Sequence, residues 1–188
     1  LDGVTGVQTC ALPISAPLLD QLEMGPVVKV VIRFREAFWE SLGHDDLSFV
    51  HDLDQPFPTW WSTLPLHTPQ LTGWCGGAPA ERLPKDEREI GQLAIASLAK
   101  IFGPPAEEIA RQVEALHVCD WRGDPHAGGA YSYVKVGGAD APQKLGRLID
   151  DTLVMAGEHT DLAMIGTVAG ALASGERAAK ALLPILSA

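Results

Sequence analysis

The segment from residue 152 to residue 183 constrains the fold most, because it joins an apolar strand to a helix lined with small side chains. "TLVMAGE", residues 152–158, is predicted to be a hydrophobic strand that stops at a glycine. "GTVAGALASGERAAKALL", residues 166–183, is predicted to be a helix that Pro184 ends. Small residues recur along it at every fourth position: Gly166, Gly170, Ser174 and Ala178. Such a helix can approach a flat cofactor closely, and its N-terminus favours an electron-rich group, but ordinary packing on a sheet explains the same pattern.

A second segment, "CDWRGDPHAGGAYSYVKVGG", residues 119–138, is rich in glycine and carries aromatic side chains. Tyr131 and Tyr133 point the same way if this stretch is extended, because side chains alternate along a strand. Together with Trp121 they suit a stacking surface for a planar ring or a cation. A buried pair of core tyrosines is the alternative interpretation.

The rest of the chain predicts a mixture of strands and helices, so the expected fold class is α/β with mixed α+β character. Strands are expected over residues 26–34, 70–77 and 115–121, with short strands at a sheet edge or cavity wall within 49–61. Asp86 and Glu89 predict a capping box, followed by a helix that ends at Gly103. Its apolar residues have helical spacing: Ile90, Leu93, Ala94, Leu98 and Ile101. A second helix is expected over about 106–114.

Composition narrows the classes of partner and compartment. Apolar residues make up 46% of the chain and charged residues 20%, which are globular values. A net charge of −10 argues against a nucleic-acid surface. The sequence contains no apolar run of about 20 residues, so no membrane span is expected. Cys75 and Cys119 match no zinc or redox spacing, so we expect no metal and two buried thiols in a reducing, cytoplasmic compartment.

Residues 1–15 fit none of these patterns, and "VTGVQTCALPIS" corresponds codon by codon to a DNA string that resembles a sequencing-library adapter. We therefore expect residues 1–15 to be a disordered artefact that takes no part in the fold. A natural disordered N-terminus is the alternative.

Taken together, the motifs resemble the C-terminal part of the flavin-containing amine oxidases, which include monoamine oxidases, polyamine oxidases and lysine-specific histone demethylases. The resemblance is carried by "W-x-x-D-P-x-x-x-G-x-Y-S-Y-V", "AGEHT" and "GTVxGAxxSGxRAA", and by "GPVVKVVIRFxxxFW" for a strand that holds an active-site lysine. It runs from Met24 to Ala179 in the family's order.

The resemblance implies roles for individual residues. Lys29 takes the position of a lysine that holds a water near the flavin, and Tyr131 that of a tyrosine flanking the substrate amine. Trp121 matches a tryptophan that packs near the flavin ring. The implied cofactor-binding residues are Trp121, Gly157, Glu158, Gly166, Thr167 and Val168, with the Gly157–Glu158 pair facing the pyrophosphate and ribityl region and backbone N–H groups at Thr167 and Val168 meeting the flavin.

Two further expectations follow from the resemblance. Ala130 stands where mitochondrial monoamine oxidases attach the flavin through a cysteine, so FAD is expected to be non-covalent. Candidates to complete the substrate cage are Trp60, Trp61 and Trp74.

The domain organisation is expected to be that of a fragment. Residues 16–121 are read as a portion of the substrate-binding domain, and residues 122–188 as the C-terminal part of the Rossmann-like FAD-binding domain. No G-x-G-x-x-G turn occurs, so we expect the N-terminal nucleotide-binding half to be missing and the isolated chain to bind FAD weakly and to be inactive.

The implied function is FAD-dependent oxidation of a small-molecule amine to an imine, with O2 reduced to H2O2. Two alternatives stay open: a desaturase or protoporphyrinogen oxidase-like dehydrogenase of the same fold, or a non-catalytic binding module.

Overall fold

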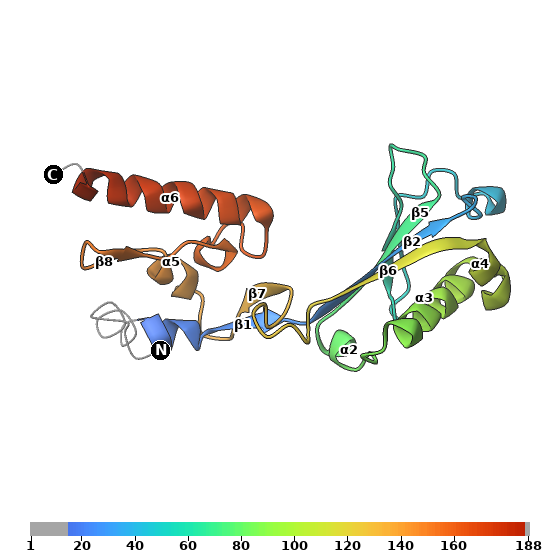
Figure 1. Cartoon of the computed structure of the whole chain (residues 1–188), viewed down its shortest axis with the longest axis horizontal. Helices are drawn as coiled ribbons and strands as arrows, with labels where there is room; N and C mark the ends of the chain where they lie inside the picture. The colour runs from blue at the N-terminus through green and yellow to red at the C-terminus, as the bar shows by residue number, and fades with distance from the viewer. Residues whose placement is uncertain (1–14, 187–188) are drawn as a thin grey trace. The chain divides into compact units, whose positions relative to one another are not determined.

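The computed structural model describes residues 15–186, so the expected artefact lies outside the described residues except for Ser15. The described chain divides into two compact units, shown in Figure 1. One unit is residues 26–128, and the other joins residues 15–25 to residues 129–186. Residues 15–25 belong with residues 129–186 because residues 22–25 pair with residues 131–134.

The first unit is built on a five-stranded antiparallel sheet in the order β3-β4-β5-β2-β6. Its strands are β2 (Val27–Phe34), β3 (Phe49–His51), β4 (Thr59–Trp61), β5 (Gln70–Gly76) and β6 (Val113–Asp120). The expected strands are confirmed, and β3 and β4 lie at one edge of the sheet as predicted.

Helices cover one face of this sheet (Figure 1). They are α2 (Ala78–Glu81), α3 (Glu87–Phe102) and α4 (Ala106–Gln112), with a short 3-10 helix η1 (Glu40–Leu42) after β2. Helix α3 begins as predicted, since Asp86 accepts a hydrogen bond from the Glu89 backbone N–H at 2.9 Å. It ends at Gly103, whose φ of +98° is the left-handed conformation typical of a helix end.

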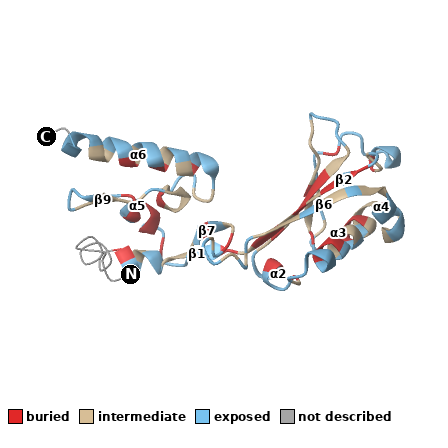
Figure 2. Ribbon diagram, viewed as in Figure 1, coloured by how far each residue is buried: buried red, intermediate tan, exposed pale blue. Residues whose placement is uncertain are grey.

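The core of this unit lies between the sheet and α3 (Figure 2). Alternate residues of β2 point into it, because side chains of a strand alternate between its two faces. Its fully buried members include Val28, Val30, Ile32, Phe34, Phe57, Trp60, Leu71, Ile90 and Leu98. The other face of the sheet is left to Lys29, Val31 and Arg33 of β2 and their cross-strand neighbours.

The second unit holds a long helix and two small two-stranded sheets. Strand β1 (Leu22–Gly25) pairs antiparallel with β7 (Tyr131–Val134), and β8 (Leu148–Ile149) pairs with β9 (Leu153–Val154). The helices are α5 (Ala141–Leu145), the 3-10 turn η2 (Glu158–Thr160) and α6 (Val168–Leu186). No helix among residues 15–186 is long and apolar enough to cross a bilayer.

The predicted hydrophobic strand over 152–158 is wrong in extent, since only Leu153–Val154 is a strand. Backbone groups further along bond to side chains of α6 instead of to a strand. The Gly157 N–H donates to Ser174 Oγ at 2.8 Å, and the Met155 carbonyl accepts from Arg177 at 2.9 Å. These side chains bind backbone N–H and C=O groups that would otherwise need a neighbouring strand as their hydrogen-bond partner.

The predicted helix end at Pro184 is also wrong, because α6 continues to Leu186. Proline removes one backbone donor from a helix. The carbonyl that this leaves without a helical donor is that of Lys180, four residues earlier, and because Lys180 is exposed water can reach it.

Candidate functional site

Lys29 lies on the face of the sheet opposite the helices. Its neighbours across the sheet are Trp74 on β5 and Cys119 on β6. The side chain is half-buried, and no hydrogen bond or ion pair within residues 15–186 engages its ammonium group. An ammonium group partly removed from water needs a polar partner, so this position suits a lysine that holds a water or a ligand.

The three candidate tryptophans do not share a face. Trp61 and Trp74 lie on the Lys29 face, because Trp61 pairs with Thr72 and Thr72 pairs with Val31. Trp60 lies on the opposite face and is fully buried, with its indole N–H donating to the Phe57 carbonyl at 2.9 Å. The prediction for Trp60 is therefore corrected: its ring packs over Gly73 in the core, where a Cβ would come within 2.7 Å of it.

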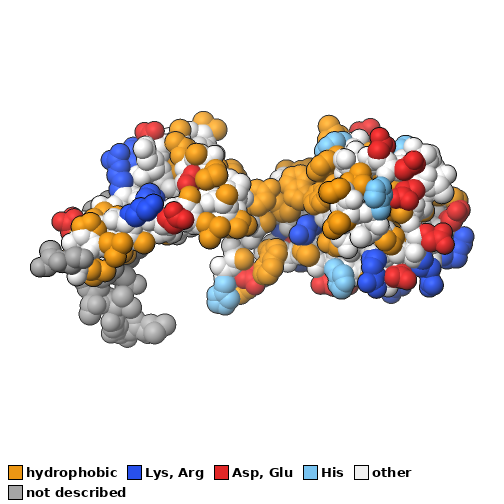
Figure 3. All heavy atoms as spheres, turned by 90° about the horizontal axis from the view of Figure 1, so that it is seen from above, with side chains coloured by type: hydrophobic (Ala, Val, Ile, Leu, Met, Phe, Trp, Pro, Cys, Tyr) orange, Lys and Arg blue, Asp and Glu red, His pale blue; other side chains and the backbone are white. Residues whose placement is uncertain are grey.

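Aromatic side chains continue along the Lys29 face toward the edge of the sheet. Phe49 packs against Trp61 at 6.0 Å between ring centroids and is stacked with His51 at 6.3 Å. Phe49 remains 63% exposed. Figure 3 shows hydrophobic side chains gathered over part of the surface of this unit, apart from most of its charged groups. This face can contact a planar or apolar ligand.

Trp121 follows β6 and is 53% exposed, as a residue that packs against a ligand requires. The next residue, Arg122, fixes its backbone. Its guanidinium donates to the Asp120 carboxylate at 2.6 Å and to the carbonyls of Ala80, Leu83 and Pro84. The hydrogen bond from Arg122 lowers the pKa of Asp120 against the opposing effect of burial. The residue that follows Trp121 is thus bound both to the end of β6 and to residues 80–84.

In the other unit, β7 presents Tyr131 and Tyr133 on one face, and both are exposed. The prediction that they point the same way is confirmed, and the alternative of a buried core pair is excluded. Ser132 between them points inward and is only 5% exposed.

The Glu158 carboxylate is bound from two sides. It accepts from the Ser132 backbone N–H at 2.9 Å, from the Ser132 hydroxyl at 2.8 Å and from the Gly166 N–H at 2.7 Å. Burial raises the pKa of Glu158, but these hydrogen bonds and the nearby His159 together hold it below its ordinary value. Glu158 is therefore a carboxylate stabilised in its ionised form.

Glycines at both ends of the loop from residue 157 to residue 166 let neighbouring side chains lie close to the backbone. Gly157 has a φ of +140°, and a Cβ on it would lie 2.5 Å from the His159 ring. Gly166 has a φ of +75°, and a Cβ on it would lie 3.4 Å from the Tyr131 ring. A residue with a side chain would be strained at both positions.

Helix α6 presents free backbone donors at its start. The Thr167 hydroxyl accepts from the Gly170 N–H at 3.0 Å, and the Thr167 carbonyl accepts from Ala171. The Thr167 N–H itself donates to Met164 at 3.3 Å. For the N–H groups of Val168 and Ala169 the described residues supply no acceptor, so they are available to a ligand. Of the four small residues predicted to share one helix face, Gly170, Ser174 and Ala178 are buried on α6, whereas Gly166 lies in the turn before the helix and is only partly buried.

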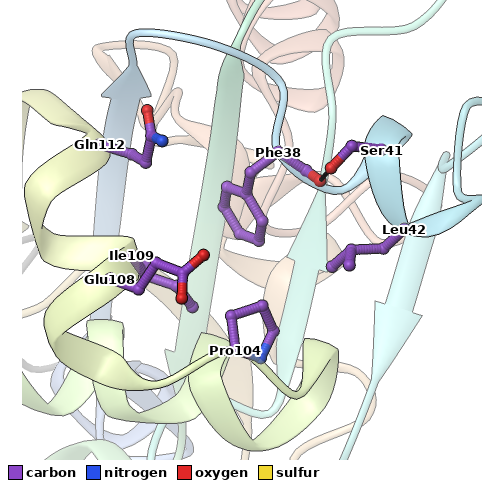
Figure 4. A pocket seen from close by; sticks show the side chains of 7 residues that line it. All are labelled: Phe38, Ser41, Leu42, Pro104, Glu108, Ile109 and Gln112. Atoms are coloured by element: carbon purple, nitrogen blue, oxygen red, sulfur yellow. Dashed lines mark hydrogen bonds between the residues drawn. The ribbon is translucent and has the colours of Figure 1, made fainter.

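Two cavities lie apart from most of these residues. One of about 300 Å³ is lined by Leu19, Leu22, Glu23, Met24, Ser132 and His159. Another of about 60 Å³ lies between Phe38–Leu42 and α4, and Figure 4 shows that polar side chains, Ser41, Glu108 and Gln112, line it together with apolar ones. No cluster of three or more metal-ligating side chains occurs among residues 15–186.

Sequence reasoning missed the residues that support the site. Ser132 could have been found, since the residue between two outward tyrosines must point inward. Arg122 could not, because its carbonyl partners lie about 40 positions earlier in the chain.

Known proteins with similar sequences identify the family to which this chain belongs. A sequence profile described as "Flavin containing amine oxidoreductase" matches residues 12–183, and so includes the last residues of the stretch expected to be foreign. The lysine-specific histone demethylase 1 homolog 3 of Arabidopsis thaliana is 31% identical over 173 residues, which are 89% of this chain and 10% of that protein. The flavin-containing amine oxidase A of Sus scrofa is 29% identical over 178 residues, 90% of this chain and 32% of its own length.

A solved structure has the same fold. Cyclohexylamine oxidase from Brevibacterium oxydans IH-35A superposes with a TM-score of 0.74 at 23% identity, covering 92% of this chain and 38% of that one. This confirms the expected mixed α/β fold class and its likeness to the amine oxidases. Because the family profile spans nearly the whole sequence, the chain belongs to the flavin-containing amine oxidoreductases, whose cofactor is FAD.

Proposed function

We propose that this chain is part of an FAD-dependent amine oxidase that converts a small amine to an imine, which water then hydrolyses. O2 is the proposed final acceptor and H2O2 its product. The observation that carries the proposal is Lys29: it lies without a polar partner among the described residues, on an aromatic sheet face, in a chain of this family.

The chemistry of the donor set fits FAD. The free N–H groups of Val168 and Ala169 and the positive end of α6 favour negative charge on a flavin. Trp121 offers an exposed aromatic face for a planar ring. Ala130 has no nucleophilic side chain, so the cofactor is held without a covalent bond at this position. When bound, FAD supplies the acceptor for the hydride equivalent that leaves the carbon beside the amine nitrogen.

The residues of this chain then have separate tasks. Lys29 holds a water near the reacting atoms through its ammonium group. Tyr131 aligns the substrate amine with its exposed ring, because the negative ring face attracts a polarised amine. Trp61 and Trp74, on the Lys29 face, form an apolar wall that excludes bulk water from part of the site.

The chain spans about a tenth to a third of the length of the curated relatives it matches. We propose that the whole protein contains further sequence that makes most of the contacts to FAD. The 188-residue chain alone is then expected to bind FAD weakly and to show no oxidase activity.

The test uses the complete product of the gene that encodes this chain. It is expected to purify with FAD that denaturation releases, and to form H2O2 when amines are added. Lys29→Met should lower the rate by about 100-fold, whereas Arg33→Met, on the same strand and face, should leave it nearly unchanged. A flavoprotein that oxidises no amine but dehydrogenates a porphyrinogen or a polyene would contradict the proposal, and so would a product that takes up no flavin.

A further inference from the structure

We propose that Glu158 is a positioning residue, whose carboxylate holds the strand carrying Tyr131 against the glycine turn that leads into α6. This inference rests on the proposed function, in which Tyr131 and the start of α6 face the amine and the flavin. It concerns how these two elements are held together, and not the chemistry itself.

The contacts reach both elements with good geometry. One carboxylate oxygen accepts from the Ser132 N–H at 2.9 Å, and the other accepts from the Ser132 hydroxyl at 2.8 Å and the Gly166 N–H at 2.7 Å. Hydrogen bonds to an ionised acceptor are about twice as strong as neutral ones. We call the Glu158 carboxylate with its donors on Ser132 and Gly166 the clamp. Because Ser132 is buried and lies directly beside Tyr131, the clamp binds the inner side of the strand, and the tyrosine ring stays on the outer side.

Gly166 brings the clamp into contact with the tyrosine ring. Its hypothetical Cβ would lie 3.4 Å from a ring carbon of Tyr131, so its backbone passes directly beside that ring. The hydrogen bond from the Gly166 N–H to Glu158 therefore fixes the backbone that lies beside the Tyr131 ring. The same backbone forms the turn that precedes Thr167. A change at Glu158 should move the ring and the free donors of α6 together.

The resemblance implied a different role, with the Glu158 side chain facing the ribityl region of FAD. In this structure three donors already occupy its two oxygens, and each donor belongs to the protein. A carboxylate has about four acceptor positions, so at most one remains for a ligand. The side chain is therefore assigned to holding the site together.

The first test is a pH titration of the isolated chain by NMR, which needs neither flavin nor a variant. The amide protons of Ser132 and Gly166 should shift together with the Glu158 carboxylate carbon, at one midpoint below the ordinary pKa of a glutamate. The three hydrogen bonds and His159 lower this pKa. Amide shifts of Ser132 and Gly166 that do not change with pH at the midpoint of the Glu158 carboxylate would overturn the proposal.

Variants then test the coupling. Glu158→Gln keeps the shape but replaces one acceptor oxygen with an NH2 donor, so either the Ser132 or the Gly166 N–H loses its partner. Hydrogen exchange at that amide should become about tenfold faster or more, and the Tyr131 ring signals should shift. Glu176→Gln is the matched control: it lies in the same unit on α6, exposed and paired with Lys180, and should change none of these signals.

A double-mutant cycle measures the link to Ser132 directly. Ser132→Ala should speed exchange at Gly166 in the wild-type chain and have a smaller effect in the Glu158→Gln background, because the shared carboxylate is already altered. Equal effects in both backgrounds would contradict a direct clamp.

The flavin-loaded gene product separates this inference from the proposed function. If Glu158 positions Tyr131, Glu158→Gln should raise KM for the amine while FAD stays bound. Loss of FAD with unchanged amide signals would instead assign Glu158 to direct cofactor binding. If the gene product takes up no flavin, the proposed function fails, and the NMR titration still decides whether the clamp exists.

Discussion

Among single residues, Arg122 joins the end of β6 to the turn after α2. Its guanidinium bonds the Asp120 carboxylate and three backbone carbonyls, and the two charged side chains are only 14% and 18% exposed. A largely buried cation with this many partners leaves several unsatisfied acceptors when it is removed. The bonds of Arg122 therefore stabilise the unit.

Arg122→Ala should lower the free energy of unfolding of residues 26–128 by about 3 kcal/mol, since it leaves the Asp120 charge without its partner. Tryptophan fluorescence during urea unfolding measures this unit specifically, because all five tryptophans lie in it. Arg33→Ala breaks an exposed pair with Glu114 and should cost about 0.5 kcal/mol or less. Equal losses in the two variants would contradict this role of Arg122.

The same pair gives this unit a defined acid sensitivity. Hydrogen bonding to Arg122 holds the pKa of Asp120 below its unfolded value. Its contribution is therefore complete above the unfolded pKa of about 3.9 and is lost as the pH falls through the folded pKa. In Asp120→Asn the fluorescence-monitored stability should fall less steeply over this acid range. An unchanged slope would show that the carboxylate contributes nothing.

Among the elements, α6 shows why small residues face inward. A Cβ on Gly170 would lie 2.2 Å from the Met164 carbonyl oxygen, whereas one on Gly175 would meet nothing within 4 Å. The loop before α6 therefore crosses the helix where only glycine leaves room for it. The stripe of small residues reflects close backbone approach at Gly170.

Two alanine substitutions in the same helix should have opposite effects. Gly170→Ala forces the loop away and should cost about 2 kcal/mol, while Gly175→Ala should stabilise α6 by about 0.5–1 kcal/mol. Hydrogen-exchange protection of peptides from residues 153–186 measures both. Similar effects of the two variants would mean that the loop and helix do not pack as described.

The elements also show how far the sequence predicts the structure. Helix α3 and strands β2 and β5 were predicted nearly to the residue, because capping residues and apolar period are local signals. Strand β1 was missed, since its partner β7 lies more than 100 residues later. The strand expected over 152–158 covers only two residues, because side chains of α6 bind the backbone that follows them. No local sequence pattern reveals these long-range bonds.

The candidate site divides in the same way. The roles of Lys29, Tyr131 and Trp121 are implied by the resemblance, and only the shared direction of Tyr131 and Tyr133 follows from alternation along a strand. In the structure Lys29 is half-buried, and Tyr131 and Trp121 are exposed. Trp60 was placed wrongly because adjacent residues of a strand face opposite sides, and only the register showed which side is buried. The contact of Glu158 with the cofactor stays a prediction from the resemblance, whereas its bonds to Ser132 and Gly166 join residues far apart in sequence that no local pattern brings together.

For the whole molecule, the predicted residues fall in both compact units: Lys29 and the tryptophans in one, Tyr131 and the start of α6 in the other. One unit contributes the Lys29 ammonium, which no residue of the described chain pairs, on an aromatic sheet face. The other contributes a tyrosine and the backbone N–H groups at the start of α6, for which the described residues supply no acceptor. We propose that these groups serve the oxidation of an amine by FAD.

The most direct test is anaerobic mixing of the flavin-loaded gene product with a panel of primary and secondary amines. Without O2 the oxidised flavin absorbance can fall only if the amine gives up its electrons, so the choice of final acceptor does not matter. We predict bleaching by at least one amine, slowed by about 100-fold in Lys29→Met. Absorbance that stays constant with every amine but bleaches with a non-amine substrate would contradict it.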